Sequence, residues 1–111
     1  MLDYDRARAE FTWAAARAQL AGLPGGGLNI AYEAVDRHAD GALADSVAMR
    51  FLSKRRAQSE HTYADLKEQT DRFAAVLDRL GVRRGERVFA LAGRIPELYV
   101  AALGTLTRIV Q

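Results

Sequence analysis

The sequence predicts an α/β fold: helices, then a β-hairpin, then one strand–helix unit of a parallel sheet. Three observations predict it. A helix with a clear start and stop occupies the middle of the chain, the apolar run "VFALA" follows it, and an apolar helical segment begins soon after that run at Pro96. A buried strand followed by a helix is the first half of a crossover that a second parallel strand completes.

Over residues 1–28 the sequence predicts an N-terminal helix followed by a glycine-rich linker. Asp3 is placed to cap a helix over residues 3–21, which Gly22 and Pro24 would end. The aromatic residues of "FTW" do not share one stripe, so a peripheral helix is as good an interpretation as a core one. The glycines of "LPGGGLN" lack the lysine and hydroxyl of a phosphate-binding loop, and a linker is therefore expected.

The second unit, residues 29–111, begins with a helix and a hairpin. Asn29 can cap the helix "IAYEAVDRHA", which ends at Asp40–Gly41. Its predicted buried face consists of Ile30, Ala34, Val35 and His38. A strand over residues 47–52, a basic loop "SKRR" and a second strand entering Thr62 and Tyr63 then predict the hairpin.

The central helix carries the clearest signals. Thr62 and Asp65 form a capping box, and Gly81 is placed to stop the helix with Val82 making the apolar contact of that turn. The residues that recur at helical spacing are Leu66, Thr70, Phe73, Leu77 and Leu80.

The last two elements are apolar. Residues 88–92 suit a strand covered on both faces in a parallel sheet. The next helix starts at Pro96 with Glu97 at its positive end, and the residues after them leave almost no polar face. We therefore expect this helix to be buried on all sides.

Composition excludes several function classes. Sixteen basic and fourteen acidic residues give a net charge of +2, too little to predict nucleic-acid binding. The absence of cysteine excludes disulfides and thiolate chemistry. A charged N-terminal stretch and the lack of any long apolar window lead us to expect a cytoplasmic chain that does not enter a membrane.

No catalytic, cofactor-binding or metal-ligating residue is predicted. His38 and His61 are the only histidines, and two such residues without cysteine make a poor metal site. The carboxylate pairs Asp36–Asp40 and Asp65–Glu68 have ordinary helix-surface spacing. Lys67–Asp71 and Glu68–Arg72 are expected to be ion pairs one helical turn apart.

A family resemblance extends over residues 4–106. In order, the segments "FTW", "LPGGGLNIAYEAVDRHADG", "VAMRFL", "TYADLKEQTDRFAAVLDRLGVRRGERV" and "RIPELYVAALGTL" resemble the N-terminal region of AMP-forming acetyl-CoA synthetases, within the adenylate-forming superfamily. The resemblance implies that the fold is an incomplete N-terminal part of that family's large domain. It also implies that residues 87–92 form a central strand and that Arg94, Pro96 and Glu97 turn into the next helix.

The family activates acetate with ATP and Mg²⁺ to acetyl-adenylate and transfers the acetyl group to coenzyme A. Its phosphate-binding loop, aromatic-Thr-Glu motif, adenosine-binding Asp and C-terminal lysine match no position here, so no cofactor is expected for this chain alone. After "GTL" at residues 104–106 the family continues with a glycine that stops the helix, whereas this chain has "TRIVQ". We therefore expect a truncated ligase, with the break between Leu106 and Thr107, that is inactive as 111 residues.

Two alternatives stay open. The chain is either that inactive ligase fragment, whose parent enzyme uses acetate, ATP and CoA, or a small non-catalytic interaction module. Such a module would complete its sheet with a partner or by self-association. In both cases the exposed strand edge and the apolar final helix are where association or aggregation is expected. Nucleic acid is not an expected partner.

Overall fold

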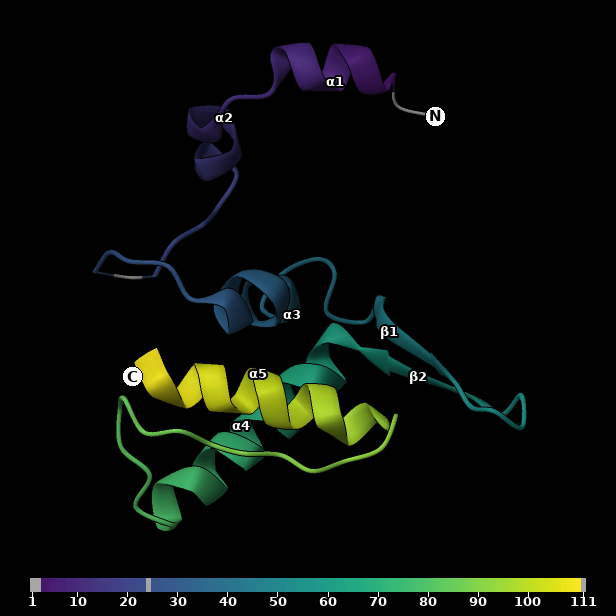
Figure 1. Ribbon diagram of the computed structural model, residues 1–111, viewed down its shortest axis with the longest axis vertical. Helices are drawn as coiled ribbons and strands as arrows, with labels where there is room; N and C mark the ends of the chain where they lie inside the picture. Colours follow the sequence, from purple (N-terminus) through teal and green to yellow (C-terminus); the bar gives the residue numbers. More distant parts are fainter. Residues whose placement is uncertain (1–2, 24, 111) are drawn as a thin grey trace.

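The computed structural model describes residues 3–23 and 25–110, so Pro24, which was expected to help end the first helix, lies outside the described residues. The fold is of mixed α/β type (Figure 1). Two long helices pack against each other, a short helical segment lies across them, and an antiparallel two-stranded sheet projects from one end. No helix in the described part of the chain has both the length and the apolar composition needed to cross a membrane.

The N-terminal segment contains two short helices, α1 (Tyr4–Glu10) and α2 (Trp13–Ala18), and the single helix predicted over residues 3–21 is therefore wrong. Asp3 caps the first helix as expected, but Thr12 accepts a hydrogen bond from the Ala15 N–H and starts a second one. A threonine N-cap has extended backbone angles, which interrupt the first helix. Neither helix has a buried residue, and Figure 1 shows both standing away from the rest of the molecule.

A helical turn follows the glycine-rich linker and consists of η1 (Tyr32–Asp36), a π-helical segment, and α3 (Arg37–Ala39). Asn29 caps it as predicted, because its Oδ1 accepts from the Ala31 and Tyr32 N–H groups at 2.8 and 3.3 Å. The predicted face is wrong at Ile30, which is 68% exposed, whereas Ala31 and Val35 are buried. In this orientation of the turn, the Asn29 amide also makes a second hydrogen bond, to a carbonyl of helix α5 (Pro96–Val110).

The hairpin lies where the sequence predicts it. Strands β1 (Val47–Leu52) and β2 (Gln58–Thr62) pair in antiparallel register, with Arg50 opposite Glu60. These two side chains form an ion pair with 2.6 Å between Nε and Oε1. The β2 strand leads directly into helix α4 (Tyr63–Arg79), so the hairpin is attached to the start of that helix (Figure 1).

Helix α4 (Tyr63–Arg79) begins and ends as the sequence predicts. Thr62 and Asp65 exchange the two hydrogen bonds of a capping box, at 3.1 and 2.9 Å, and these bonds hold the pKa of the Asp65 carboxyl below its usual value. Gly81, with a φ of 76°, ends the helix, and the Val82 N–H donates back to the Leu77 carbonyl.

The buried face of α4 differs in part from the predicted one. Leu66, Thr70 and Leu77 are buried as expected, and Ala74 joins them. Leu80, however, is 73% exposed because it is the residue that caps the end of the helix, beyond the last turn that packs.

Helix α5 (Pro96–Val110) starts at the predicted proline and packs along α4 (Figure 1). Among the residues of this helix whose burial is described, Val100, Gly104 and Thr107 are buried, one or two turns apart on a single face. The expectation of burial on all sides is wrong, since Tyr99 is 54% exposed. Among the described residues, α4 packs along this helix, and the segment of residues 88–90 and the hairpin lie against parts of it.

Residues 88–92 were expected to form a strand covered on both faces, and this is also wrong. The segment is extended but is not a strand, since the sheet of the described residues contains β1 and β2 only. Phe89 is 89% exposed and Leu91 is fully exposed, while Val88 is half-buried against α5. A strand needs a hydrogen-bonded neighbour, and nothing in the described part of the chain lies beside this segment in that role.

Candidate functional site

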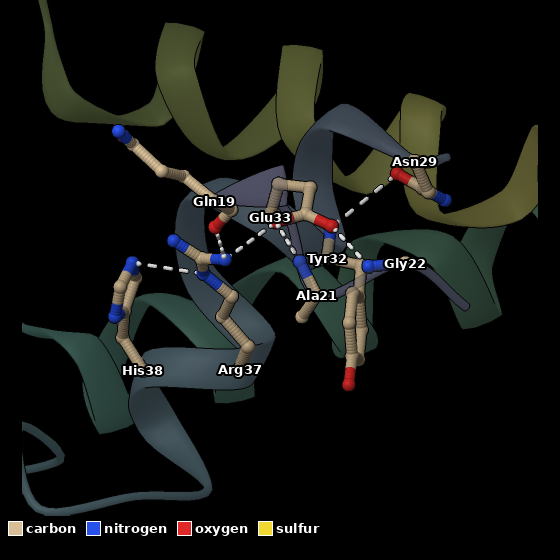
Figure 2. A network of polar contacts seen from close by, with 8 residues as sticks. All are labelled: Gln19, Ala21, Gly22, Asn29, Tyr32, Glu33, Arg37 and His38. Carbon is tan, nitrogen blue, oxygen red and sulfur yellow. Dashed lines mark hydrogen bonds and ion pairs between the residues drawn. The ribbon is translucent and has the colours of Figure 1, made fainter. Parts of the chain in front are cut away.

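A polar network joins the N-terminal segment to the helical turn (Figure 2). The Glu33 carboxylate accepts hydrogen bonds from the Gly22 N–H at 2.7 Å and from the Ala21 N–H at 3.1 Å. Arg37 lies 2.8 Å from the same carboxylate and also donates to the Gln19 carbonyl at 3.0 Å. The ion pair of Glu33 and Arg37 therefore holds the incoming chain at Gln19, Ala21 and Gly22.

The electrostatics of this network favour the charged form of Glu33. Its side chain is 13% exposed, and the resulting desolvation acts to raise its pKa. The two backbone N–H groups and the positive charge of Arg37 outweigh that effect, so the pKa of Glu33 lies below its usual value. A carboxylate held by these partners serves to anchor the chain.

Asn29 forms a second tie, to the other end of the molecule. Its amide Nδ2 donates to the Leu106 carbonyl at 3.3 Å, while its Oδ1 caps the helical turn. Asn29 is 7% exposed, so both ends of the amide are satisfied within the protein. One buried side chain thus fixes α5 against the start of residues 29–40.

The two histidines occupy different environments. His38 accepts a long hydrogen bond from the Arg37 Nε at 3.4 Å and contacts the ring of Tyr63, with 5.0 Å between ring centroids. His61 is in β2, and its Nε2 is buried without a partner among the described residues. Within the described ranges, no three His, Cys, Asp or Glu side chains lie close enough to hold a metal ion.

Charged side chains line the outer surface of α4. Lys67 pairs with Asp71 at 3.3 Å and Glu68 pairs with Arg72, which confirms both predicted ion pairs. Asp36, on the neighbouring turn, has a raised pKa because burial disfavours its charge, although Lys67 partly opposes that shift. Its Oδ1 is buried without a partner in the described residues.

An apolar hollow of about 370 Å³ lies between the hairpin, α4 and α5. Met49, Phe51, Leu66 and Leu103 are among its lining residues. Arg50 is its one charged lining residue among those described, and Glu60 already pairs with it. The hollow therefore suits apolar side chains and offers no charged group to orient a nucleotide.

The sequence pattern missed the network around Glu33. The spacing of Glu33 and Arg37 is that of a helical ion pair and would have indicated their contact. No sequence signal links them to Gln19, Ala21 and Gly22, because that contact depends on how the chain turns at the glycine-rich linker. Gly22 itself has a φ of 73°, which favours glycine there.

Comparison with known proteins places these features in context. Residues 35–108 match the family described as AMP-binding enzyme. The chain is 37% identical over 105 residues to the acetyl-coenzyme A synthetase of Bacillus subtilis, covering 94% of this chain and 18% of that protein. It is 42% identical over 81 residues to the acetyl-coenzyme A synthetase of Methanothrix soehngenii, covering 71% and 12%.

A solved structure agrees with these matches. The crystal structure of Brucella canis acyl-CoA synthetase superposes with a TM-score of 0.80 at 35% identity, covering 98% of this chain and 20% of that one. The chain thus spans less than a fifth of the length of the curated relatives described above. Because the likeness covers 98% of this chain, it extends beyond residues 35–108 of the family match.

Proposed function

The chain belongs to the AMP-binding enzyme family, and we propose that it is the N-terminal part of an AMP-forming ligase for acetate or another short-chain carboxylate. The observation that carries this proposal is the match of nearly the whole chain, in sequence and in fold, to acetyl-coenzyme A and acyl-CoA synthetases. The proposal includes a cytoplasmic location and a division into residues 1–28 and residues 29–111.

The proposed reaction has two steps. The carboxylate attacks the α-phosphorus of ATP to form an acyl-adenylate and release pyrophosphate, and the thiol of coenzyme A then takes the acyl group and releases AMP. Mg²⁺ would neutralise the phosphates during the first step. The sequence of this chain contains no counterpart of the family's phosphate-binding loop or catalytic lysine, so its residues support the active site without forming it.

We therefore propose that residues 1–111 alone do not catalyse the reaction. The tightly partnered groups, Glu33, Arg37 and Asn29, are occupied in holding the chain together. The purified chain should give no acetate-dependent exchange of pyrophosphate into ATP. Exchange above the level of a protein-free blank would contradict this part of the proposal.

A chimera tests whether the chain can serve as a ligase segment. The residues of the Bacillus subtilis acetyl-coenzyme A synthetase that align with this chain are replaced by residues 1–111, and acetyl-CoA formation is measured. We expect a folded and active chimera, because the fold and the apolar pattern are preserved. A matched chimera with Gly104→Leu, which disrupts the contact between α4 and α5, should lose activity. A folded but inactive first chimera would argue against the ligase assignment.

The second candidate function is a non-catalytic interaction module. The observation that favours it is the exposure of Phe89 and Leu91 along an extended segment without hydrogen-bonded neighbours in the described structure. An active chimera would favour the ligase segment, whereas a folded and inactive chimera would favour the module.

A further inference from the structure

The tip of the β1–β2 hairpin carries three consecutive cationic side chains, those of Lys54, Arg55 and Arg56. All three residues are exposed, and the tip lies at the end of the hairpin that points away from both long helices (Figure 1). None of the three side chains forms an ion pair with any other residue that the structure describes. The tip therefore presents a concentrated positive charge to its surroundings.

The hairpin itself supplies no acidic partner for this charge. Glu60 is the one acidic residue of residues 47–62. Its carboxylate lies 2.6 Å from the Arg50 Nε and accepts a hydrogen bond from the Gln58 amide at 2.8 Å. Because Glu60 already has these partners within the hairpin, the cations at the tip keep their charge unneutralised.

The backbone of the tip is held in a shape that is unfavourable for an arginine. The Arg56 N–H donates to the Ser53 carbonyl at 2.9 Å, and the Ser53 Oγ accepts from the Ala57 N–H at 3.0 Å. Arg56 has a φ of 62°, and among the described residues it is the one non-glycine residue with a positive φ. Hairpin loops with a left-handed residue after the turn favour glycine there. A third cation in this position is a strained choice, and such strain is common where a protein binds something.

An exposed apolar side chain adjoins the cations. Leu52, the last residue of β1, is 66% exposed and lies opposite Gln58. Residues 52–58 contain no aromatic side chain that could stack on a base, which disfavours single-stranded nucleic acid as the ligand. Cations beside an exposed leucine instead suit a protein segment that offers carboxylates and one large apolar side chain.

We propose that residues 52–56 form a docking site for an acidic segment of another protein. Carboxylates of that segment pair with the three cations of the tip, and an apolar side chain of the segment covers Leu52. The inference goes beyond the ligase assignment and does not rest on it, so loss of ligase activity in the chimera would leave it unchanged.

The test measures binding of a dye-labelled short peptide of glutamates with one central leucine, by fluorescence anisotropy at low salt. The natural chain should bind this peptide and not a glutamine peptide of the same length, and the affinity should fall as salt rises. A double variant, Lys54→Gln with Arg55→Gln, should raise the dissociation constant about tenfold or more.

The matched control removes the same charge from another exposed basic turn. Arg83→Gln with Arg84→Gln lowers the net charge equally and should change the dissociation constant less than about twofold, since charges outside the contact are screened. An equal loss of binding in both double variants would show that the peptide responds to net charge alone, and would overturn the proposal.

Arg56→Gly separates binding from folding. Glycine suits the positive φ at this position, so the variant should unfold at a higher temperature than the natural chain. It also removes one cation and should raise the dissociation constant about threefold or more. Unchanged or tighter binding by this folded variant would argue against a contact between Arg56 and the peptide, and would overturn the proposal as stated.

Leu52→Thr tests the apolar contact. Threonine keeps a high strand propensity, so the hairpin should be preserved. The variant should bind the leucine-containing peptide about threefold more weakly, but it should bind a peptide with glutamine in place of that leucine as well as the natural chain does. An equal change for both peptides would contradict the contact with Leu52.

The same measurements in the chimera with the Bacillus subtilis protein place the tip in a ligase of full length. We expect the tenfold difference between the natural tip and the Lys54→Gln, Arg55→Gln tip to persist there. Absence of binding by the folded chimera would show that other parts of a ligase cover the tip, and would overturn the proposal. Tighter binding of a single-stranded oligonucleotide than of the peptide would overturn it in favour of nucleic acid.

Discussion

Gly104 sets how closely α4 and α5 approach each other. A Cβ at this position would lie 2.8 Å from the Thr70 carbonyl oxygen and 3.0 Å from a ring carbon of Phe73. The Thr70 oxygen is backbone and cannot rotate away, so a larger residue would push the two helices apart. Since this pair of helices holds most of the buried apolar residues, the glycine matters to the whole core.

We predict that Gly104→Ala destabilises the chain by about 1–3 kcal/mol, as overpacked cores do. Alanine has the better helix propensity by about 1 kcal/mol, so a destabilisation would show that the contact with Thr70 outweighs propensity. Urea unfolding measures the change. Gly93→Ala is the control, since a Cβ there meets nothing within 4 Å and its effect should stay small. An unchanged or increased stability in Gly104→Ala would contradict the close packing of the helices.

Glu33 gives the attachment of the N-terminal segment a pH dependence. The pKa of Glu33 is lower in the folded state than in the unfolded chain. The stabilisation that its carboxylate provides is therefore fully present above the unfolded pKa. That contribution is lost as the pH falls through the folded pKa. We predict that Glu33→Gln speeds proteolysis at the glycines of residues 25–27 near pH 7, and that the difference from the natural chain vanishes in acid.

Glu10→Gln is the control for this charge effect. Glu10 pairs with Arg6 on an exposed surface, where its side chain is 63% accessible and removal of one ion pair changes little. Equal cleavage rates for Glu33→Gln and the natural chain at pH 7 would mean that the bonds to Ala21 and Gly22 do not hold the segment.

At the scale of elements, the end of α4 depends on a backbone conformation that favours glycine. Gly81 has a φ of 76°, and its N–H donates to the Asp78 carbonyl at 2.9 Å. We predict that Gly81→Ala destabilises the chain by about 1 kcal/mol, because the left-handed conformation is unfavourable for a residue with a Cβ. The stability of Gly81→Asn should lie between those of the natural chain and Gly81→Ala, since asparagine tolerates this conformation better than alanine does. Thermal unfolding measures the relative stability of the natural chain and the two variants. A Gly81→Ala variant as stable as the natural chain would contradict the role of Gly81 in ending α4.

The elements that the sequence predicts well are those whose determinants are local. The capping box of Thr62 and Asp65, the stop at Gly81 and the start at Pro96 each depend on residues within one or two turns, and the structure has them where the pattern indicates. The helix over residues 3–21 is divided because Thr12 is itself a good N-cap, and the pattern of alanine and arginine concealed that competition. The network around Glu33 was missed because its partners come from the far side of a linker.

At the scale of the molecule, residues 88–92 mark the limit of prediction from sequence. Their apolar run is typical of a central strand, but strand formation needs a neighbour to accept and donate hydrogen bonds. Among the described residues no such neighbour is present, so the same residues that suit a core lie exposed beside α5. For the same reason the predicted all-round burial of α5 does not occur. The apolar pattern indicates that these residues need burial and, for the strand, a hydrogen-bonded neighbour. The surrounding fold determines whether both are present.

The segment of residues 87–92 leads to one prediction about local protection. Its amides should exchange with solvent almost as fast as in an unfolded chain, since they have no hydrogen-bond acceptor among the described residues. The interior amides of α4 should be well protected under the same conditions.

Hydrogen exchange resolved by residue can measure this pattern directly. The amides of α1 and α2 provide a second reference, since these helices have no buried residue and should exchange faster than the interior amides of α4. Protection of residues 87–92 would mean that this segment already has a neighbour within the chain, and it would contradict the prediction.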